Sequence, residues 1–229
     1  MSQPILEVHG LAKLYGTTPV FSGVELKVGP GEGVQIIGRN GVGKSTLIKT
    51  LAGLIAPTSG QSLVFGQESR WLKSGERRVG VLAHQSMLYP NLSARENLEF
   101  YAELYSIPSP SECASQWLER VGLEAAADKR VRTFSRGMEQ RLAIARAMFA
   151  EPDLLLLDEP FAALDGDGVA MVTGLIKEAI ARGRAVLITA HAPMELGGLR
   201  FEMLELVRGR LAPYGEEGRH ARLRSLSAG

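Results

Sequence analysis

The sequence has little of the residue types that build cross-links and metal centres. Its single cysteine, Cys113, excludes a disulfide within the chain and fits a reducing compartment. The four histidines, His9, His84, His191 and His220, are scattered without the spacing of metal ligands. An apolar core must therefore hold the fold, and histidine chemistry would have to come from a single side chain.

An excess of one charge and long apolar runs are also missing. The 26 basic and 25 acidic residues leave a formal net charge of +1, whereas a dedicated DNA-binding domain usually has a strongly basic face. We therefore expect no nucleic-acid partner. The longest purely aliphatic run, residues 154–157, is too short to span a membrane, and residues 1–10 lack the pattern of a signal peptide. A role at a membrane would depend on a partner.

Short apolar strands and amphipathic helices alternate along the chain, which is typical of an α/β fold with a parallel sheet covered on both faces. We predict strands at residues 5–8, 20–28, 33–37, 61–65, 79–83, 154–159, 185–189 and 201–207. We predict helices at residues 44–51, 92–105, 111–123, 135–150 and 168–181. The second of these helices starts with a capping box, in which Ser93 is followed three residues later by Glu96.

The run of helices in the middle of the chain predicts its domain organisation. At 229 residues, the chain suits one domain with an insert. We expect residues 1–85 and 151–215 to form the core, and residues 86–150 to form an inserted helical subdomain. Residues 216–229 read as a basic tail that frays.

Residues 38–46, GRNGVGKST, match the pattern of a phosphate-binding loop between a strand and a helix. Its glycines allow backbone N–H groups to curl around phosphates, Lys44 supplies a charge for the β- and γ-phosphates, and Ser45 offers a hydroxyl to Mg²⁺. A glycine-rich turn with a chance lysine is the alternative, but both flanking elements fit the motif. The residues expected to bind nucleotide here are Gly38, Asn40, Gly41, Gly43, Lys44, Ser45 and Thr46.

Further polar residues follow other predicted strands, at the sheet edge where ligands bind in α/β folds. Asp158 and Glu159 end the aliphatic run at 154–157; Asp158 would hold Mg²⁺ and Glu159 would polarise the attacking water. A solvated turn would also explain this pair if it stood alone. His191 follows a strand and would be within reach of a γ-phosphate. Gln85 follows another strand and could contact Mg²⁺ or the water.

Residues 133–141, TFSRGMEQR, predict a second helix start that can receive an anion. Ser135 suits a helix cap, while Gly137 leaves backbone N–H groups bare. A plain capped helix is the simpler interpretation, but Met138 stands where a capping box would have Glu or Gln. The chain therefore carries two anion-receiving helix starts, far apart in sequence.

Together these motifs resemble those of the ATP-binding subunits of ABC transporters, over roughly residues 5–215. The resemblance implies a P-loop NTPase (RecA-like) core with an N-terminal antiparallel β-subdomain and an inserted α-helical subdomain. Residues 38–46 look like the Walker A loop and 154–160 like Walker B; residues 134–138, FSRGM, look like the family signature. The remaining motif residues would be Tyr15 on the adenine (with Phe21 as the fallback), Gln85 in the Q-loop, Asp165 in the D-loop and His191 as the switch histidine.

In this family two cassettes pair head to tail, so the signature of one contacts the nucleotide of the other. The resemblance implies that Ser135 and the Gly137 N–H bind ATP held by a second chain, in a homodimer or a paired cassette. Arg136 and Met138 depart from the common L-S-G-G-Q signature, and Ala190 replaces a frequent hydroxyl residue. The two groups needed for the anion contact are kept, so we expect the signature to function, and Glu159 is intact, so we expect an active ATPase that uses ATP and Mg²⁺.

The resemblance also implies integral membrane transporter subunits as partners, docked near residues 86–92, and a cytoplasmic location on the inner face of the membrane. Residues 82–105 are most like the ATP-binding subunit of haem exporters in cytochrome c maturation, so we expect an exporter, possibly of haem. A non-transport ABC ATPase in DNA repair or chromosome maintenance is the alternative. A small-molecule kinase would share the phosphate loop but would leave FSRGM unexplained.

Overall fold

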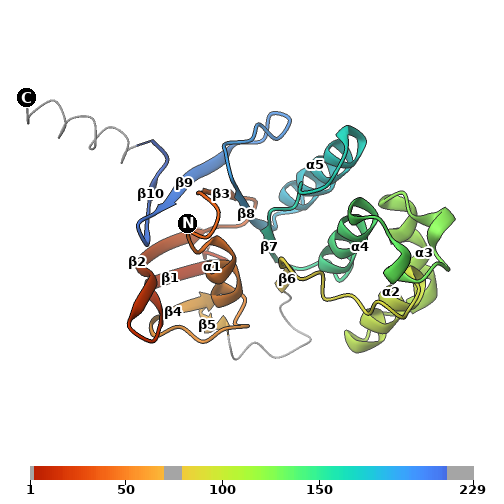
Figure 1. Cartoon of the computed structure of the whole chain (residues 1–229), viewed down its shortest axis with the longest axis horizontal. Helices are drawn as coiled ribbons and strands as arrows, with labels where there is room; N and C mark the ends of the chain where they lie inside the picture. The colour runs from red at the N-terminus through yellow and green to blue at the C-terminus, as the bar shows by residue number, and fades with distance from the viewer. Residues whose placement is uncertain (1–2, 70–78, 216–229) are drawn as a thin grey trace, which may run out of the picture.

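The computed structural model describes residues 3–69 and 79–215, which form two β-sheets (Figure 1). The smaller sheet is antiparallel, with its strands in the order β2-β1-β4-β5. These strands are β1 (Leu6–Tyr15), β2 (Thr18–Val28), β4 (Ser59–Val64) and β5 (Gln67–Glu68). The predicted basic tail, residues 216–229, lies outside the described residues.

Strand β1 is longer than the predicted 5–8 because it continues through a bulge at Gly10. This glycine has a φ of +55°, and its N–H donates to Glu25 Oε1 at 2.6 Å. The register between β1 and β2 shifts between Val8 and Leu11. A glycine inside a strand pattern marks a bulge as readily as an end, and here the bulge is what forms.

The larger sheet has the order β10-β9-β3-β8-β7-β6. Its strands are β3 (Gly33–Ile37), β6 (Val79–Leu82), β7 (Leu154–Asp158), β8 (Ala185–Ala190), β9 (Phe201–Val207) and β10 (Arg210–Pro213). All neighbouring pairs are parallel except the β9–β10 hairpin, so the predicted parallel sheet is confirmed with one antiparallel edge. Every residue of β3, β7 and β8 is buried, which explains why their sequences are apolar except for Gln35, Asp158 and Thr189.

This sheet separates two apolar cores, because successive side chains of a strand point to opposite faces. Leu154 and Leu156 of β7 pack with the antiparallel sheet and helix α1 (Lys44–Leu51). Leu155 and Leu157 pack in the other core, with the remaining long helices. The sheet is therefore the middle layer between a β-rich side and a helical side.

The helices of the second face are α2 (Ala94–Leu104), α3 (Pro110–Arg120), α4 (Arg136–Met148) and α5 (Gly166–Ala181), with 3₁₀ turns η2 (Glu124–Ala126) and η3 (Val131–Thr133) between α3 and α4. Figure 1 shows α2, α3 and α4 together at one end of the molecule, away from α1. The predicted capping box of α2 is confirmed: Ser93 Oγ accepts from Glu96 N at 3.1 Å, and Glu96 Oε2 accepts from Ser93 N at 2.7 Å. No helix in the described residues has the length and apolar composition for a membrane crossing.

Candidate nucleotide site

The predicted phosphate loop, residues 38–46, joins β3 to α1 at the C-terminal edge of the parallel sheet. The Gly38 N–H donates to the Ala190 carbonyl of β8 at 3.2 Å, which ties the loop to the sheet. Gly43 precedes α1 with a φ of +114°, and a Cβ there would stand 2.6 Å from Val20 Cγ1, so glycine is required. Helix α1 has no side-chain cap, which leaves its first N–H groups free to bind an anion.

Lys44 places its ammonium group inside this loop. The residue is only 4% exposed, and Nζ donates to the carbonyls of Gly38 at 2.7 Å and Arg39 at 3.3 Å. Glu159 Oε1 lies 3.4 Å from the same nitrogen. A cation held at a helix start among glycine N–H groups suits the oxygens of a phosphate chain. Asn40, Gly41, Ser45 and Thr46 lie in the same loop and the first turn of α1.

Two carboxylates at the end of β7 are fixed by one hydroxyl of the neighbouring strand β8. Thr189 Oγ1 donates to Asp158 Oδ1 at 2.6 Å and accepts from the Glu159 N–H at 3.0 Å. Asp158 is buried, whereas Glu159 is partly exposed. Glu159 has a φ of +50°, a left-handed conformation that is uncommon outside glycine and often occurs at functional sites.

His191 follows β8 and completes this group. Its Nε2 lies 2.9 Å from Glu159 Oε2, and half of its side chain is exposed. The Glu159 carboxylate therefore contacts Lys44 on one oxygen and His191 on the other. The structure thus brings together three residues from three segments that the sequence singles out separately.

The predicted Mg²⁺ ligands Ser45 and Asp158 lie at the same sheet edge, since α1 starts there and packs against β7. Mg²⁺ takes oxygen ligands, usually one or two carboxylates with substrate phosphates and water. A hydroxyl and a carboxylate at this edge fit such a site. Within residues 3–69 and 79–215, no group of three or more His, Cys, Asp or Glu side chains could hold a metal. Two oxygen donors from the protein leave coordination positions of Mg²⁺ that phosphate oxygens and water would fill.

Gln85 lies on the loop after β6, with its side chain exposed. The next residue, Ser86, anchors this loop to α4: its Oγ donates to Glu139 Oε1 at 2.6 Å. The Ser86 carbonyl accepts from Arg146 Nε at 3.2 Å, and Arg146 Nη2 donates to the Val81 carbonyl at 2.6 Å. Burial lowers the pKa of this guanidinium. Gln85 thus sits where the sheet and the helical subdomain are joined.

The second anion-receiving helix start, at Ser135, is formed by α4. Ser135 Oγ accepts from Met138 N at 3.2 Å, so the serine does cap the helix, although Met138 cannot return a bond as a capping box would. The Ser135 hydroxyl keeps its proton for a phosphate oxygen. A Cβ on Gly137 would stand 3.0 Å from the Ala163 carbonyl. Figure 1 shows α4 well separated from α1, whose loop would hold the chain's own nucleotide.

Asp165 caps α5 and turns toward α4. Its Oδ1 accepts from the Gly168 N–H at 2.9 Å and from Arg141 Nη2 at 2.8 Å. The hydrogen bond from Gly168, and then the one from Arg141, lower the pKa of the Asp165 carboxyl. In this chain Asp165 is therefore tied to the signature helix rather than to the phosphate loop.

The two candidate adenine-stacking residues differ in exposure. Tyr15 is 54% exposed at the end of β1, with Lys13 Nζ 5.2 Å from its ring centroid. Phe21 is fully buried in the core, so the fallback assignment is wrong. The hairpin that carries Tyr15 also carries Val20, which reaches Gly43 of the phosphate loop. Tyr15 is therefore the one of the two that an adenine could reach.

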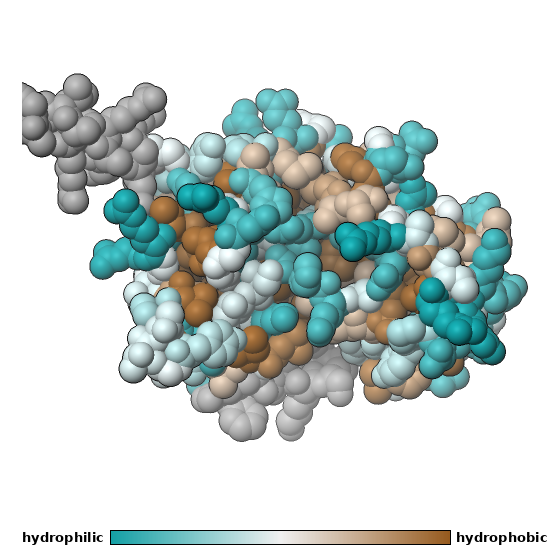
Figure 2. Space-filling view, in the orientation of Figure 1, coloured by the Kyte–Doolittle hydropathy of each residue, from teal (hydrophilic) through white to brown (hydrophobic). Residues whose placement is uncertain are grey.

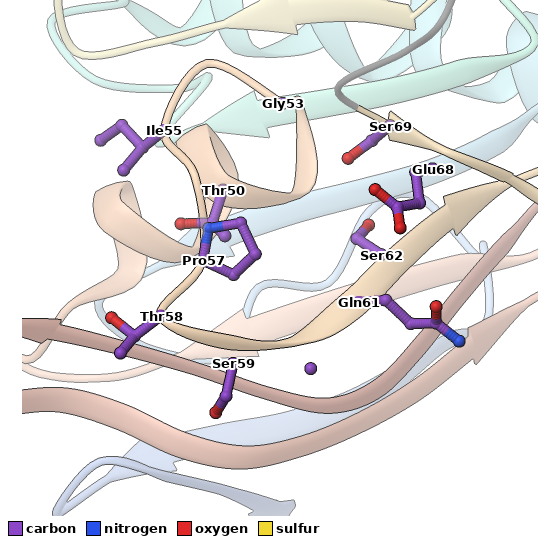
Figure 3. Close-up of a pocket in the computed structure, with 11 residues that line it drawn as sticks. Thr50, Gly53, Ile55, Pro57, Thr58, Ser59, Gln61, Ser62, Glu68 and Ser69 are labelled. Carbon is purple, nitrogen blue, oxygen red and sulfur yellow. The ribbon is translucent and has the colours of Figure 1, made fainter.

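A separate pocket of about 170 Å³ lies between the end of α1 and strands β4 and β5 (Figure 3). Thr50, Ser62 and Glu68 are among the residues that line it. Thr50 is at the opposite end of α1 from Lys44, and no predicted site residue lines this pocket. The pocket is not part of the candidate site.

Several side chains that hold the site are absent from the residues that the sequence motifs single out. The sequence does contain a sign of the role of Thr189, because it is the lone hydroxyl residue in the otherwise apolar strand β8, AVLITA. The sequence contains no such sign for Gln140, because its partners are distant in the chain. Its Nε2 donates to the carbonyls of Glu159 at 3.3 Å and Pro160 at 3.1 Å, which lie about twenty positions further on. Arg141 had none either, because its partner Asp165 is equally remote in sequence.

Comparison with known proteins decides the family. The ABC transporter family profile matches residues 21–162, which include the phosphate loop, the signature segment and the two carboxylates. The chain belongs to the ABC transporter family. The resemblance inferred from the motifs is confirmed at this level.

Two relatives of this ABC transporter chain are named as export or transport ATPases. The Nod factor export ATP-binding protein I of Cupriavidus metallidurans is 35% identical over 190 residues, which cover 82% of this chain and 63% of that protein. The bacitracin transport ATP-binding protein BcrA of Bacillus licheniformis is 39% identical over 194 residues, which cover 84% and 63%. The ABC transporter chain therefore spans less than two thirds of the length of both.

A solved structure shares the fold of this ABC transporter chain. It is a dimeric ATP-binding cassette in a post-hydrolysis state with ADP and Pi, and it matches with a TM-score of 0.80 at 27% identity. The match covers 90% of this chain and 96% of that one. The predicted fold class, a P-loop NTPase core with a β-subdomain and an inserted helical subdomain, is confirmed.

Proposed function

We propose that this chain is the ATP-hydrolysing subunit of an ABC transporter. One observation carries the proposal: Lys44, Glu159 and His191 meet beside Asp158 at the mouth of the phosphate loop. Lys44 supplies a cation that can bind the phosphates, Glu159 a carboxylate that can activate water, and His191 a side chain that can contact the γ-phosphate. A structural ion pair would not require Glu159 to adopt its left-handed conformation.

In the proposed reaction the chain's own residues bind, orient and accept a proton. The loop N–H groups and Lys44 hold the triphosphate, and Glu159 accepts the proton of the attacking water while His191 fixes the γ-phosphate end. Mg²⁺, held by Ser45, Asp158 and Gln85, would neutralise charge on the phosphates. Thr189 keeps Asp158 and Glu159 in these separate roles through its two hydrogen bonds.

We further propose that two copies, or this chain and a related cassette, pair head to tail around ATP. Ser135 and Gly137 lie on α4, away from the loop that binds the chain's own nucleotide, and a solved relative of the same fold is dimeric. Hydrolysis would remove the γ-phosphate that both surfaces bind and would favour opening.

Size-exclusion chromatography of the Glu159→Gln variant tests this pairing. With ATP and Mg²⁺ the variant should elute as a dimer, because binding is kept and turnover is slowed. Adding Gly137→Asp should return it to a monomer that still binds ATP, since a carboxylate would then face the partner's phosphates. A dimer that survives Gly137→Asp would refute the assignment of the signature.

The proposed membrane partner docks on an aromatic surface beside Gln85, consisting of Met87, Tyr89, Phe100 and Leu104. All four side chains are exposed, and the Tyr89 and Phe100 rings meet edge to face at 4.9 Å. In Figure 2 hydrophobic residues interrupt the hydrophilic surface over the helical end of the molecule. Because α4 holds this loop through Ser86, a rotation of the helical subdomain would move a partner docked there.

Co-purification from membranes tests this docking. Phe100→Glu should reduce the membrane subunits that accompany the tagged protein, because a charge would be buried against an apolar partner. Leu54→Glu is the matched control, since Leu54 is 52% exposed on the other side of the molecule, after α1. Equal recovery with both variants would contradict the surface assignment.

Export is the proposed direction, and the cytoplasmic face of the membrane is the proposed location. The name of the Nod factor relative supports export, the name of the bacitracin relative supports transport, and neither name mentions haem. The haem proposal therefore rests only on residues 82–105. No observation favours the DNA-repair alternative; salt-dependent DNA binding by the purified protein would support it, and ATPase stimulation by membrane subunits would exclude it.

A further inference from the structure

Both the N–H and the carbonyl of Glu159 are hydrogen-bonded to side chains, and only the partner of the N–H belongs to the central sheet. Its N–H donates to Thr189 of β8 at 3.0 Å. Its carbonyl, and that of Pro160, accept from Gln140 Nε2 at 3.3 and 3.1 Å. Because Glu159 has a φ of +50°, these contacts help to maintain a conformation that a non-glycine residue adopts at a cost.

Gln140 belongs to α4, five residues after the Ser135 cap. Its two sequence neighbours bind the adjacent loops of the same chain. Glu139 accepts from Ser86 after β6, and Arg141 donates to Asp165 at the start of α5. One turn of α4 therefore contacts the loops after β6 and β7 and the start of α5. Within this turn, Gln140 is the residue that contacts the loop after β7, at Glu159 and Pro160.

Hydrogen bonding rather than tight packing gives this contact its strength. A cavity of about 310 Å³ lies beside Gln140, bordered by Ala83, Arg136 and Ala163 among others. The side chain is therefore not wedged in place on that side. A change in the orientation of α4 would therefore act on the two hydrogen bonds themselves, since side-chain packing does not hold Gln140 on that side.

We infer that Gln140 is a positioning residue for Glu159, through which the orientation of the helical subdomain sets the rate of hydrolysis in the same chain. The inference rests on the proposed ATPase function. Gln140 does not contact the phosphate loop; it fixes the peptide that follows Glu159, and so the direction of the carboxylate. Because Ser135 starts the same helix, a ligand bound there would act on Glu159 through one rigid element.

Steady-state kinetics of Gln140→Met tests the inference. Methionine keeps the length of the side chain but cannot donate, so kcat should fall about tenfold, as expected for a lost positioning hydrogen bond, while KM for ATP stays within about twofold. The kcat of Gln140→Glu should fall further than that of Gln140→Met, because a carboxylate would face two carbonyl oxygens. Gln116→Met on α3 is the control and should match the wild type, because this exposed glutamine donates to Glu112 of its own helix.

Dimerisation separates positioning from a general effect on α4. The double variant Glu159→Gln, Gln140→Met should still form the ATP-dependent dimer, because the signature contact is intact. Loss of that dimer, an unchanged kcat in Gln140→Met, or a Gln140→Glu variant more active than Gln140→Met would each overturn the inference. A wild-type protein without ATPase activity would instead refute the proposed function, and the inference with it.

Discussion

Replacing Thr189 by valine should destabilise the protein more than its size change suggests. Valine keeps the shape of threonine but removes the hydroxyl that binds Asp158 Oδ1 and the Glu159 N–H. Thr189 is 1% exposed, so water cannot readily replace either bond. A buried group left without its partner costs about 1–3 kcal/mol, and a bond to a carboxylate contributes about 1.5–3 kcal/mol. We expect a combined loss of about 2–4 kcal/mol, since the added methyl recovers part of it.

Thr189→Ser is the matched control, because it keeps the hydroxyl and removes only a methyl group, at about 1 kcal/mol. Urea unfolding of both variants without nucleotide gives the comparison. The valine variant should also lose more ATPase activity, since Glu159 would lack its anchor on β8. If valine and serine prove equally stable, the hydroxyl does not hold the two carboxylates and the reasoning fails.

The remaining predictions concern the loop and the start of α5. Lys44→Ala should weaken ATP binding and abolish turnover, measured by fluorescent-nucleotide titration and phosphate release; normal hydrolysis would refute its role. Gly43→Ala should lower ATP affinity, because the new Cβ would meet Val20 at a left-handed position; affinity equal to the wild type would contradict the loop geometry. Asp165→Asn should lower stability at neutral pH. Because the folded-state pKa of Asp165 is lowered, its contribution is present above the unfolded pKa and is lost as the pH falls through the folded pKa. The gap between variant and wild type in urea unfolding should therefore close in acid, and a gap that persists there would exclude the charge as its cause.

Features that local chemistry determines were predictable from the sequence. Strand β3 and helix α1 have their predicted bounds, because the glycine-rich loop between them punctuates the chain sharply. The capping box at Ser93 needs only two residues three positions apart. The phosphate-loop residues were likewise predictable, since a single segment carries them all.

Features that depend on distant segments were not predictable. Gln140 and Arg141 become site residues only when α4 packs beside β6 and α5, and nothing in their neighbours along the chain indicates this. Phe21 looked like a possible base-stacking aromatic, but its position on β2 points it into the core. The bulge at Gly10 needed Glu25 from the next strand to accept its N–H. In each case a tertiary contact overrides the local pattern.

The division of apolar side chains between the two faces of the parallel sheet has a mechanical consequence. The predicted phosphate-binding loop leads into α1, which packs with the β-rich side, whereas α2, α3 and α4 pack on the opposite side. A shift of those helices would leave the packing of α1 against β7 in place and would reach the phosphate loop through Glu159, which contacts Lys44. In the proposed transporter subunit, nucleotide binding and the transmission of movement to a partner would therefore rest mainly on two different apolar cores of one polypeptide.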